Sequence, residues 1–345
     1  MTNSIAPLPA LAITLGDPAG IGPEIIAKAF RDAPEVLRGC FVAGDVGTLR
    51  RAVGYVSGPG AVELPVALIA TPAEALDMPP RCIPVLQVVA DAVDAPLGQV
   101  SAAAGRVAAN CVVWAARAAL RGEIGGLVTA PLHKEALAAA GVHYPGHTEL
   151  LQAEAAAHAG CAVADMQVRM MLANDELRTV LVSIHVALRA AIEAVTFDGV
   201  LQTLRITKAS LVRMLGRAPR IAVAGLNPHA GEGGLFGREE LDVIVPAIAT
   251  ARAEGIDAQG PYAPDTVFMR ARKGVFDVVV AMYHDQGLIP VKYLGVEKGV
   301  NVTLGLPLVR TSPDHGTAFD IAGQGIADAD SLVQAVRVAR QLARG

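Results

Sequence analysis

The chain contains 345 residues, with 29 Lys and Arg against 33 Asp and Glu and a formal net charge of −4 at pH 7. A nucleic-acid-binding protein usually carries an excess of basic residues on one face, so this mildly acidic balance argues against that class. Hydrophobic residues make up 52% of the chain, which excludes an intrinsically disordered protein. Only 4% of the residues are aromatic, so we expect a core of Ala, Val, Leu and Ile in a chain long enough for two domains.

The sequence disfavours both membrane insertion and secretion. No uncharged apolar run reaches the roughly 18 residues that a membrane-spanning helix needs, and residues 1–10 lack a basic region before their apolar residues. The four cysteines, Cys40, Cys82, Cys111 and Cys161, are spaced neither as a disulfide framework nor as a thiolate zinc site. We therefore expect a cytoplasmic protein with neither a membrane nor a nucleic acid as a partner.

Short aliphatic runs alternate with helical patterns along the chain. The runs are too short for helices and indicate strands; they cover residues 11–17, 40–45, 66–70, 125–131, 168–173, 179–185, 220–229 and 276–284. Helical patterns start at Pro23, which suits a first helical position, and recur at 102–121, 187–195, 198–215 and 239–253. Strands that alternate with helices predict an α/β fold with a mostly parallel sheet covered on both faces.

Three of the predicted strands end in a histidine, at His185, His229 and His284. Ligands of open parallel sheets bind beyond the carboxyl ends of the strands, so the three histidines would lie at one edge if these strands share a sheet. Three neutral imidazoles can bind a divalent metal ion and leave one position open for a substrate. Three separately hydrogen-bonded histidines are an equally good interpretation, because the spacing matches no zinc signature.

Two segments rich in glycine and small residues, 16–24 and 314–328, have the composition of ligand-binding loops. The first follows a strand and precedes a helix, as a phosphate-binding turn does. However, Ile25 stands where the dinucleotide fingerprint has a small residue, and no Lys-Ser or Lys-Thr pair follows. A tight strand-to-helix turn is therefore favoured for the first segment, whereas the second could press its backbone against a ligand.

Polar residues also accompany the apolar runs that follow His284, namely Lys292, Asn301 and Arg310. Burying an unpaired charge at the end of an apolar strand is costly, so an anionic ligand would be a suitable partner for the two cations. A solvated surface position is the alternative for each of them.

Six longer segments resemble the motifs of one family, the 4-hydroxythreonine-4-phosphate dehydrogenases of vitamin B6 biosynthesis, or PdxA family. They are GDPAGIGPEI, PGHTELL, NPHAGEGGLFGREE, GPYAPDTVF, AMYHDQGLIPVKYL and GVNVTLGLPLVRTSPDHGTAFDIAG. The resemblance runs from about residue 11 to residue 338. The last motif also looks like the adenosine-binding loop of isocitrate and isopropylmalate dehydrogenases.

The resemblance implies roles for individual residues. The implied metal ligands, for Zn, Mg or Co, are His185, His229 and His284. The implied substrate contacts are His147, Thr148, Lys292, Asn301 and Arg310, and the implied catalytic residues are Asp265 and Lys292. The implied contacts to NAD or NADP are His315, Gly316, Asp320 and Gly323.

The resemblance also implies an architecture. Two α/β/α domains similar to those of isocitrate and isopropylmalate dehydrogenases would flank an active site in the cleft between them. Residues 1–119 with 291–345 would bind the cofactor, and residues 120–290 would bind metal and substrate and form the dimer. The implied assembly is a homodimer in which both subunits contribute to each site.

The implied reaction is the oxidation of 4-phosphohydroxy-L-threonine to 2-amino-3-oxo-4-phosphooxybutanoate, followed by decarboxylation to 3-amino-2-oxopropyl phosphate. The segments IHVALRAA and FDIAG also resemble paralogues that act on D-threonate or D-erythronate 4-phosphate or on aromatic dihydrodiols. The segment GHTE and the Lys292, Asn301 and Arg310 set favour a phosphorylated hydroxy acid. A metal-dependent hydrolase and a binding protein without turnover are the alternatives from other classes.

Overall fold

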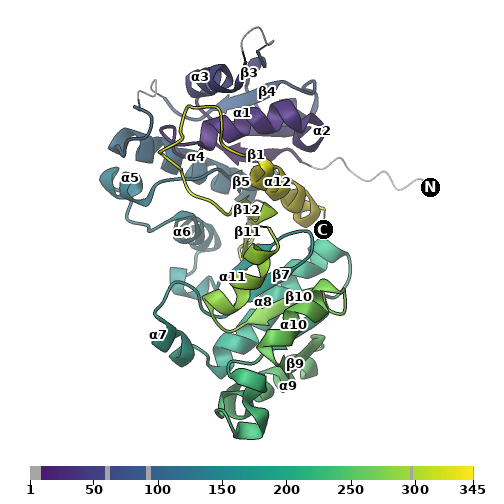
Figure 1. The fold of residues 1–345 in the computed structure, drawn as a ribbon. Helices are drawn as coiled ribbons and strands as arrows, with labels where there is room; N and C mark the ends of the chain where they lie inside the picture. The colour runs from purple at the N-terminus through teal and green to yellow at the C-terminus, as the bar shows by residue number, and fades with distance from the viewer. Residues whose placement is uncertain (1–8, 59–62, 91–94, 296–297, 345) are drawn as a thin grey trace, which may run out of the picture. The chain divides into compact units, whose positions relative to one another are not determined.

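The computed structural model describes residues 9–58, 63–90, 95–295 and 298–344 (Figure 1). Residues 1–8, part of the segment that argues against a secretory signal, lie outside the described residues. The chain divides into two compact units. The terminal unit contains the residues up to Met166 together with Leu306–Arg344, and the central unit contains Gln167–Gly305.

The terminal unit contains a parallel sheet with the strand order β3-β4-β2-β1-β5-β12. Its strands are β1 (Leu11–Thr14), β2 (Cys40–Gly44), β3 (Val66–Ile69), β4 (Ile83–Gln87), β5 (Gly126–Thr129) and β12 (Arg310–Pro313). Its helices are α1 (Gly22–Asp32), α2 (Pro34–Leu37), α3 (Val46–Val56), α4 (Ala102–Leu120), α5 (Lys134–Ala139), α6 (His147–Ala159) and α12 (Asp330–Ala343), with short 3₁₀ turns at Pro72–Leu76 and Val163–Asp165.

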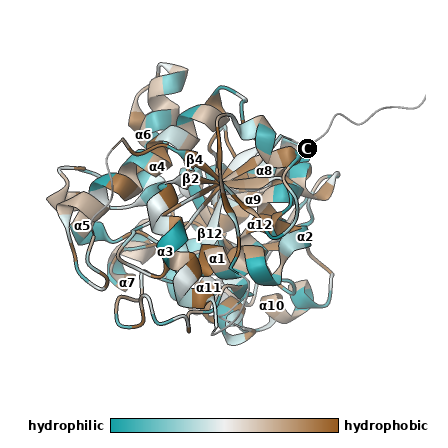
Figure 2. Ribbon diagram, turned by 90° about the horizontal axis from the view of Figure 1, so that it is seen from above, coloured by the Kyte–Doolittle hydropathy of each residue, from teal (hydrophilic) through white to brown (hydrophobic). Residues whose placement is uncertain are grey.

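Buried aliphatic strands form the core of the terminal unit. Every residue of β1, β2 and β5 is buried, as expected for strands of a sheet covered on both faces. Helix α4 packs against these three strands and begins at Ser101, whose Oγ accepts the Ala104 N–H. Helix α3 begins in the same way, because the Asp45 carboxylate accepts the Thr48 N–H at 2.7 Å. In Figure 2 the strands are largely hydrophobic, whereas helices such as α3 carry hydrophilic residues as well.

The central unit contains a mixed sheet with the strand order β11-β6-β7-β10-β8-β9. Strand β6 is antiparallel to β11 and to β7, and the other pairings are parallel. The strands are β6 (Arg169–Ala173), β7 (Arg178–Leu181), β8 (Ile221–Ala224), β9 (Ala258–Tyr262), β10 (Val278–Ala281) and β11 (Val300–Leu304). The helices are α7 (Leu188–Glu193), α8 (Phe197–Leu215), α9 (Val245–Ala253), α10 (Pro264–Arg272) and α11 (His284–Tyr293), with a 3₁₀ segment at Pro228–Gly234 and a π-helical turn at Glu240–Ile244.

The core of the central unit gathers side chains from β7, β8, β10, α10 and α11, among them Leu181, Val279 and Leu288. Outside this core, Asp277 precedes β10 and accepts hydrogen bonds from the guanidinium groups of Arg217 and Arg220. These two arginines hold the pKa of the Asp277 carboxyl well below its usual range. The ion pairs therefore tie the segment before β8 to the segment before β10.

The predicted α/β class and the mostly parallel sheet are confirmed, and each of the eight predicted strands corresponds to an observed one. Strands β4, β9, β11 and β12 were not among the predicted strands. The two compact units meet after residues 166 and 305, whereas the predicted domain boundaries lie after residues 119 and 290. Helices α5 and α6 pack on α4 and stay in the terminal unit, while β11 pairs with β6 and stays in the central unit. The roles assigned to the two predicted domains stay predictions.

Within the described part of the chain, no helix combines the length and the apolar character needed to cross a membrane.

Candidate active site

Three neighbouring parallel strands of the central unit lead to the three candidate metal ligands. Strand β10 lies between β7 and β8 and is parallel to both, so the three strands that precede the histidines share a sheet. His185, His229 and His284 follow the last residues of β7, β8 and β10 in loops or at a helix start. Because parallel strands place their carboxyl ends at one edge, the three segments emerge from the same edge of this sheet.

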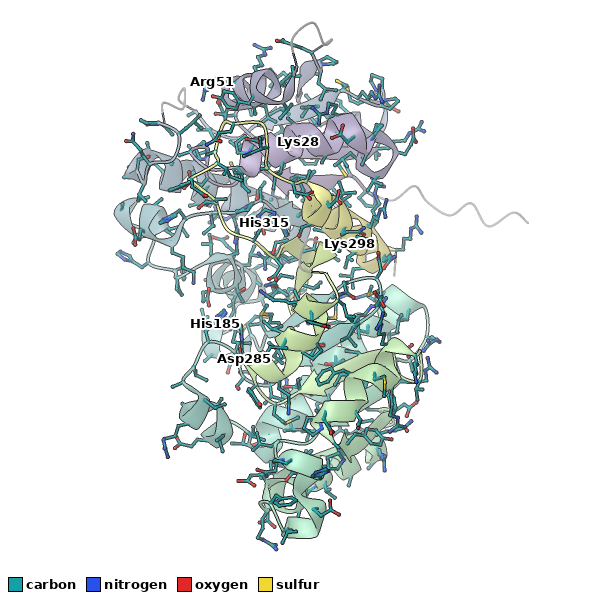
Figure 3. The ribbon with its side chains drawn as sticks, in the orientation of Figure 1. Lys28, Arg51, His185, Asp285, Lys298 and His315 are labelled. Carbon is teal, nitrogen blue, oxygen red and sulfur yellow. The ribbon has the colours of Figure 1, made fainter. Side chains whose placement is uncertain are left out.

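Two of the three imidazoles lie next to each other. The ring centroids of His185 and His284 are 5.7 Å apart, and His185 and Asp285 are labelled near the start of α11 in Figure 3. The Nδ1 atom of His284 lies 2.7 Å from Oδ1 of Asp285. With Nδ1 engaged by a carboxylate, Nε2 is the nitrogen of His284 that is available to a ligand, which is a common arrangement around metal-binding histidines.

His229 lies in a backbone of unusual conformation. Residues 229–234 all have positive φ angles, including 51° at His229, 52° at Ala230 and 44° at Glu232. Each non-glycine residue in this left-handed region costs roughly 1–2 kcal/mol, so the surrounding structure must hold the segment in place. Its ring centroid lies 6.1 Å from that of Phe236. Strain of this kind is concentrated at ligand-binding and catalytic segments.

Glu240 holds the segment that leads to His229. Its side chain is buried, and its Oε1 accepts the backbone N–H groups of Leu226 and Asn227, both at 2.7 Å. Its Oε2 accepts the Asn227 side-chain amide at 2.9 Å. A Cβ atom on Gly231 would lie 2.7 Å from the same Oε2, so the carboxylate fits closely against the left-handed turn.

The donor chemistry of this edge suits a divalent metal ion, since imidazole is a common ligand of such ions. The 5.7 Å between the ring centroids of His185 and His284 is compatible with two imidazoles on one ion, because zinc–nitrogen bonds are about 2.0–2.1 Å long. Among the residues that the structure describes, no three His, Cys, Asp or Glu side chains are already grouped closely enough to hold a metal. The structure thus brings together two of the three predicted ligands and places the third after the adjacent strand.

The other candidates of the central unit lie on α10, α11 and β11. Asp265 is exposed in the first turn of α10, directly after β9, which is parallel to β8. Lys292 is exposed in the last turn of α11. Asn301 lies on β11, opposite Leu172 of β6, and is half-buried.

The terminal unit contains a buried cation, Arg310, which acts on the half-buried imidazole of His147. Arg310 begins β12 and is 4% exposed, and its Nε and Nη2 donate to Oγ1 of Thr129 at the end of β5. Burial lowers the pKa of Arg310 to about 10, so the guanidinium stays charged near neutrality. Burial and the charge of Arg310 lower the pKa of His147 well below its usual 6.5.

His147 and Thr148 form the first turn of α6. The Nε2 atom of His147 is buried and has no hydrogen-bond partner among the described residues. The buried guanidinium and the positive end of a helix together favour an anionic ligand, while the neutral imidazole, which donates to the Ala130 backbone, presents Nε2 as an acceptor for a ligand hydroxyl. Thr129, which supports Arg310, was not predicted, because a threonine at the end of a buried strand has no distinguishing sequence pattern.

The two glycine-rich segments, 16–24 and 314–328, pack against each other within the terminal unit. The Ile21 N–H donates to the Thr317 carbonyl at 3.0 Å, and a Cβ atom on Gly20 would lie 2.8 Å from the same oxygen. The later segment is also held at Ala327, whose N–H donates to Glu24 and whose carbonyl accepts from Lys28. The first segment is therefore the tight turn that its sequence favoured, and it supports the second.

The predicted cofactor contacts lie along the second segment. His315 and Asp320 are exposed, and His315, labelled in Figure 3, places its Nδ1 3.1 Å from the Gly316 carbonyl. Gly323 has a φ of 77° and helps to line a small cavity. The same cavity is lined by Glu24, Thr48, Arg51, Tyr55 and Leu97. This group was not predicted from the sequence, because its members come from α1, α3 and the loop before α4.

Comparison with known proteins agrees with the resemblance. The family model described as pyridoxal phosphate biosynthetic protein PdxA matches residues 37–339. The chain belongs to this family. A 4-hydroxythreonine-4-phosphate dehydrogenase of Beijerinckia indica is 56% identical over 96% of this chain and 94% of its own. A D-threonate 4-phosphate dehydrogenase of Salmonella typhimurium is 46% identical over 96% of this chain and 98% of its own.

A solved structure gives the same result for the fold. The crystal structure of 4-hydroxythreonine-4-phosphate dehydrogenase from Klebsiella pneumoniae superposes with a TM-score of 0.86, at 40% identity over 97% of this chain and 99% of that one. These family members are named dehydrogenases, so the chain is an oxidoreductase that uses a nicotinamide cofactor.

Proposed function

We propose that this protein oxidises 4-phosphohydroxy-L-threonine with NAD or NADP to 2-amino-3-oxo-4-phosphooxybutanoate, which then loses CO₂ to give 3-amino-2-oxopropyl phosphate. The observation that carries the proposal is the set of histidines after three adjacent parallel strands, in a chain 56% identical to a protein of that name. The two electrons of the alcohol leave as hydride to the nicotinamide, and its proton goes to a base.

His185, His229 and His284 would hold one divalent ion, for which Zn, Mg and Co are the candidates. Such an ion supplies Lewis acidity, which lowers the pKa of a bound hydroxyl and polarises a neighbouring carbonyl. The pairing of His284 with Asp285 supports this role, because a carboxylate on one ring nitrogen fixes the orientation of the other.

Five polar residues would bind the anionic and hydroxyl groups of the substrate. Arg310 offers a charged guanidinium that is already held by Thr129, and His147 offers a neutral imidazole. Thr148, Lys292 and Asn301 would add hydrogen bonds. Asp265 and Lys292, both exposed, are the candidates for taking the hydroxyl proton.

The glycine-rich segment 314–328 would bind the cofactor through His315, Gly316, Asp320 and Gly323. Its support by the 16–24 turn favours this role, because a backbone that is already fixed loses less entropy when a ligand binds.

The assembly proposed is a homodimer whose subunits share their sites. Leu188 and Ile192 lie four residues apart on α7, and Ile289 and Tyr293 lie four apart on α11, so each pair shares one helix face. All four side chains are exposed, and apolar helix faces of this kind are typical of subunit interfaces. Leu188→Asp places a charge on this apolar helix face. Sedimentation measurements on the variant test the dimer, and we expect the variant to be a monomer.

A substrate panel on the metal-loaded protein tests the reaction. The formation of NADH or NADPH is followed with 4-phosphohydroxy-L-threonine, D-threonate 4-phosphate and D-erythronate 4-phosphate. The proposal expects the highest kcat/KM with the first compound. Preference for either of the others would assign the chain to a paralogous activity, and release of phosphate without NADH or NADPH would assign it to a hydrolase.

A further inference from the structure

The Gln286 side chain connects two of the loops that lead to the candidate metal ligands. Gln286 lies in the first turn of α11 and is buried. Its Oε1 accepts the Met282 N–H, and its Nε2 donates to the Gly225 carbonyl, both at 2.7 Å. One partner is an N–H and the other is a carbonyl, so a side-chain amide satisfies both, whereas neither a carboxylate nor an apolar chain can.

The two backbone partners of Gln286 lie close in sequence to different histidines. Met282 precedes His284 by two residues, and Gly225 precedes His229 by four. The two hydrogen bonds of the Gln286 side chain therefore hold the end of β10 against the end of β8. A Cβ atom on Gly225 would lie 2.8 Å from Cα of Ala230. The Gly225 backbone therefore packs directly against the left-handed turn that contains His229.

The same connection extends to the third histidine loop. The Met282 carbonyl accepts the backbone N–H and the hydroxyl of Ser183, at 3.2 and 3.0 Å. Ser183 is buried and precedes His185 by two residues. The Met282 carbonyl thus accepts hydrogen bonds from the His185 loop, and the Met282 N–H donates to Gln286.

Glu240 holds the backbone before His229 through a second set of hydrogen bonds. Its carboxylate holds the N–H groups of Leu226 and Asn227, which directly follow Gly225. The backbone that leads to His229 is therefore held from α11 by Gln286 and from the π-helical turn by Glu240. Together these contacts form a continuous series of hydrogen bonds beneath all three histidines.

From this series we infer that Gln286 is a positioning residue that fixes the His229 and His284 loops relative to each other, so that their imidazoles can bind one divalent ion. The inference rests on the metal site of the proposed function. Gln286 itself contacts neither metal nor substrate in this account. It acts through the backbone, by removing the freedom of two loops that would otherwise have to be ordered when the metal binds.

The test measures Co²⁺ binding by the full-length protein carrying Gln286→Met, a substitution that keeps the length of the side chain and removes both hydrogen bonds. Titration with CoCl₂ gives the affinity, and the visible absorption of bound Co²⁺ reports its coordination. We expect a ten- to hundredfold loss of affinity, the usual effect of removing a group that supports metal ligands, together with an altered absorption spectrum.

Thr207→Val provides the matched control. Thr207 is fully buried on α8 of the same unit, and its hydroxyl donates to the Thr203 carbonyl at 2.7 Å. This variant also loses a buried hydrogen bond, but that bond lies within α8 and does not contact the loops that carry His185, His229 and His284. We expect its Co²⁺ affinity and spectrum to match those of the unsubstituted protein, even where its melting temperature falls.

Wild-type affinity in folded Gln286→Met would overturn the inference and leave the metal site intact. An equal loss in Thr207→Val would also overturn it, since the effect would then be one of general stability. Failure of the unsubstituted protein to bind Co²⁺ would instead reject the metal site itself, and the inference with it. If Gln286→Met does not fold, Gln286→Glu tests the same residue, because it keeps an acceptor for the Met282 N–H and loses the donor to the Gly225 carbonyl. A severalfold weaker affinity supports the inference, and an unchanged affinity overturns it.

Discussion

In the terminal unit, burial and the charge of the Arg310 guanidinium together lower the pKa of the His147 imidazole. His147 is consequently neutral near pH 7, while Arg310 keeps its charge. Arg310 can therefore offer a full charge to an anion, whereas Nε2 of His147 can accept a hydrogen bond from a hydroxyl of the same ligand.

Replacing Arg310 by Ala is expected to weaken substrate binding more than tenfold and to change NAD binding little. Hydrogen bonds to charged groups contribute roughly 1.5–3 kcal/mol, and the cofactor is assigned to a different segment. Isothermal titration with each ligand separately measures both affinities. Equal losses for the two ligands would refute the assignment of Arg310 to the substrate.

The lowered pKa of His147 predicts a dependence of stability on pH. In the unfolded chain a histidine takes up a proton below about pH 6.5, whereas folded His147 stays neutral to a lower pH. The unfolded state then binds more protons, so the free energy of unfolding falls as the pH drops below about 6.5. Urea titrations between pH 8 and pH 5 are expected to show a shallower fall for His147→Gln. His158→Gln, at an exposed position of the same helix, should keep the slope of the unsubstituted protein.

Asp277→Asn is expected to destabilise the protein at pH 7 by about 2 kcal/mol, the scale of hydrogen bonds to a charged group. Arg217 and Arg220 hold the pKa of Asp277 below its usual value. Their stabilising effect is therefore complete above the unfolded pKa of about 3.9 and is lost as the pH falls below it. The difference in unfolding free energy between variant and parent should shrink in acid. A difference that stays constant down to pH 3 would contradict this account.

Removal of the metal is expected to abolish turnover, since the proposed site supplies the Lewis acid for both steps. Dialysis against a chelator followed by addition of ZnCl₂ or CoCl₂ measures the loss and its recovery. His185→Asn should prevent recovery, while His143→Asn, at an exposed position of the terminal unit, should permit it. Full activity of the chelated protein would remove the metal from the mechanism.

The sequence predicted those parts of the molecule that depend on local pattern. Aliphatic runs such as those of β8 and β10 identify buried strands by composition alone, and the histidines that follow them mark an edge of the sheet. The strand β9, AQGPY, is short and contains both glycine and proline, so no strand pattern is visible there.

The supporting side chains could not be predicted. Gln286, Glu240 and Thr129 act on groups that are far away in sequence or that belong to the backbone. Their types are common on exposed helices and strand ends. Only the three-dimensional structure shows that their partners are the loops beneath the candidate ligands and the buried Arg310.

Strand β12 pairs with β5 although the whole central unit separates them in the chain. During synthesis at ~5–20 residues per second, a ribosome needs on the order of ten seconds to pass from one strand to the other. For that time the nascent terminal unit has an open sheet edge beside β5 and lacks the segment assigned to the cofactor. The segment 314–328, which is proposed to bind the cofactor, is therefore synthesised only after the whole central unit.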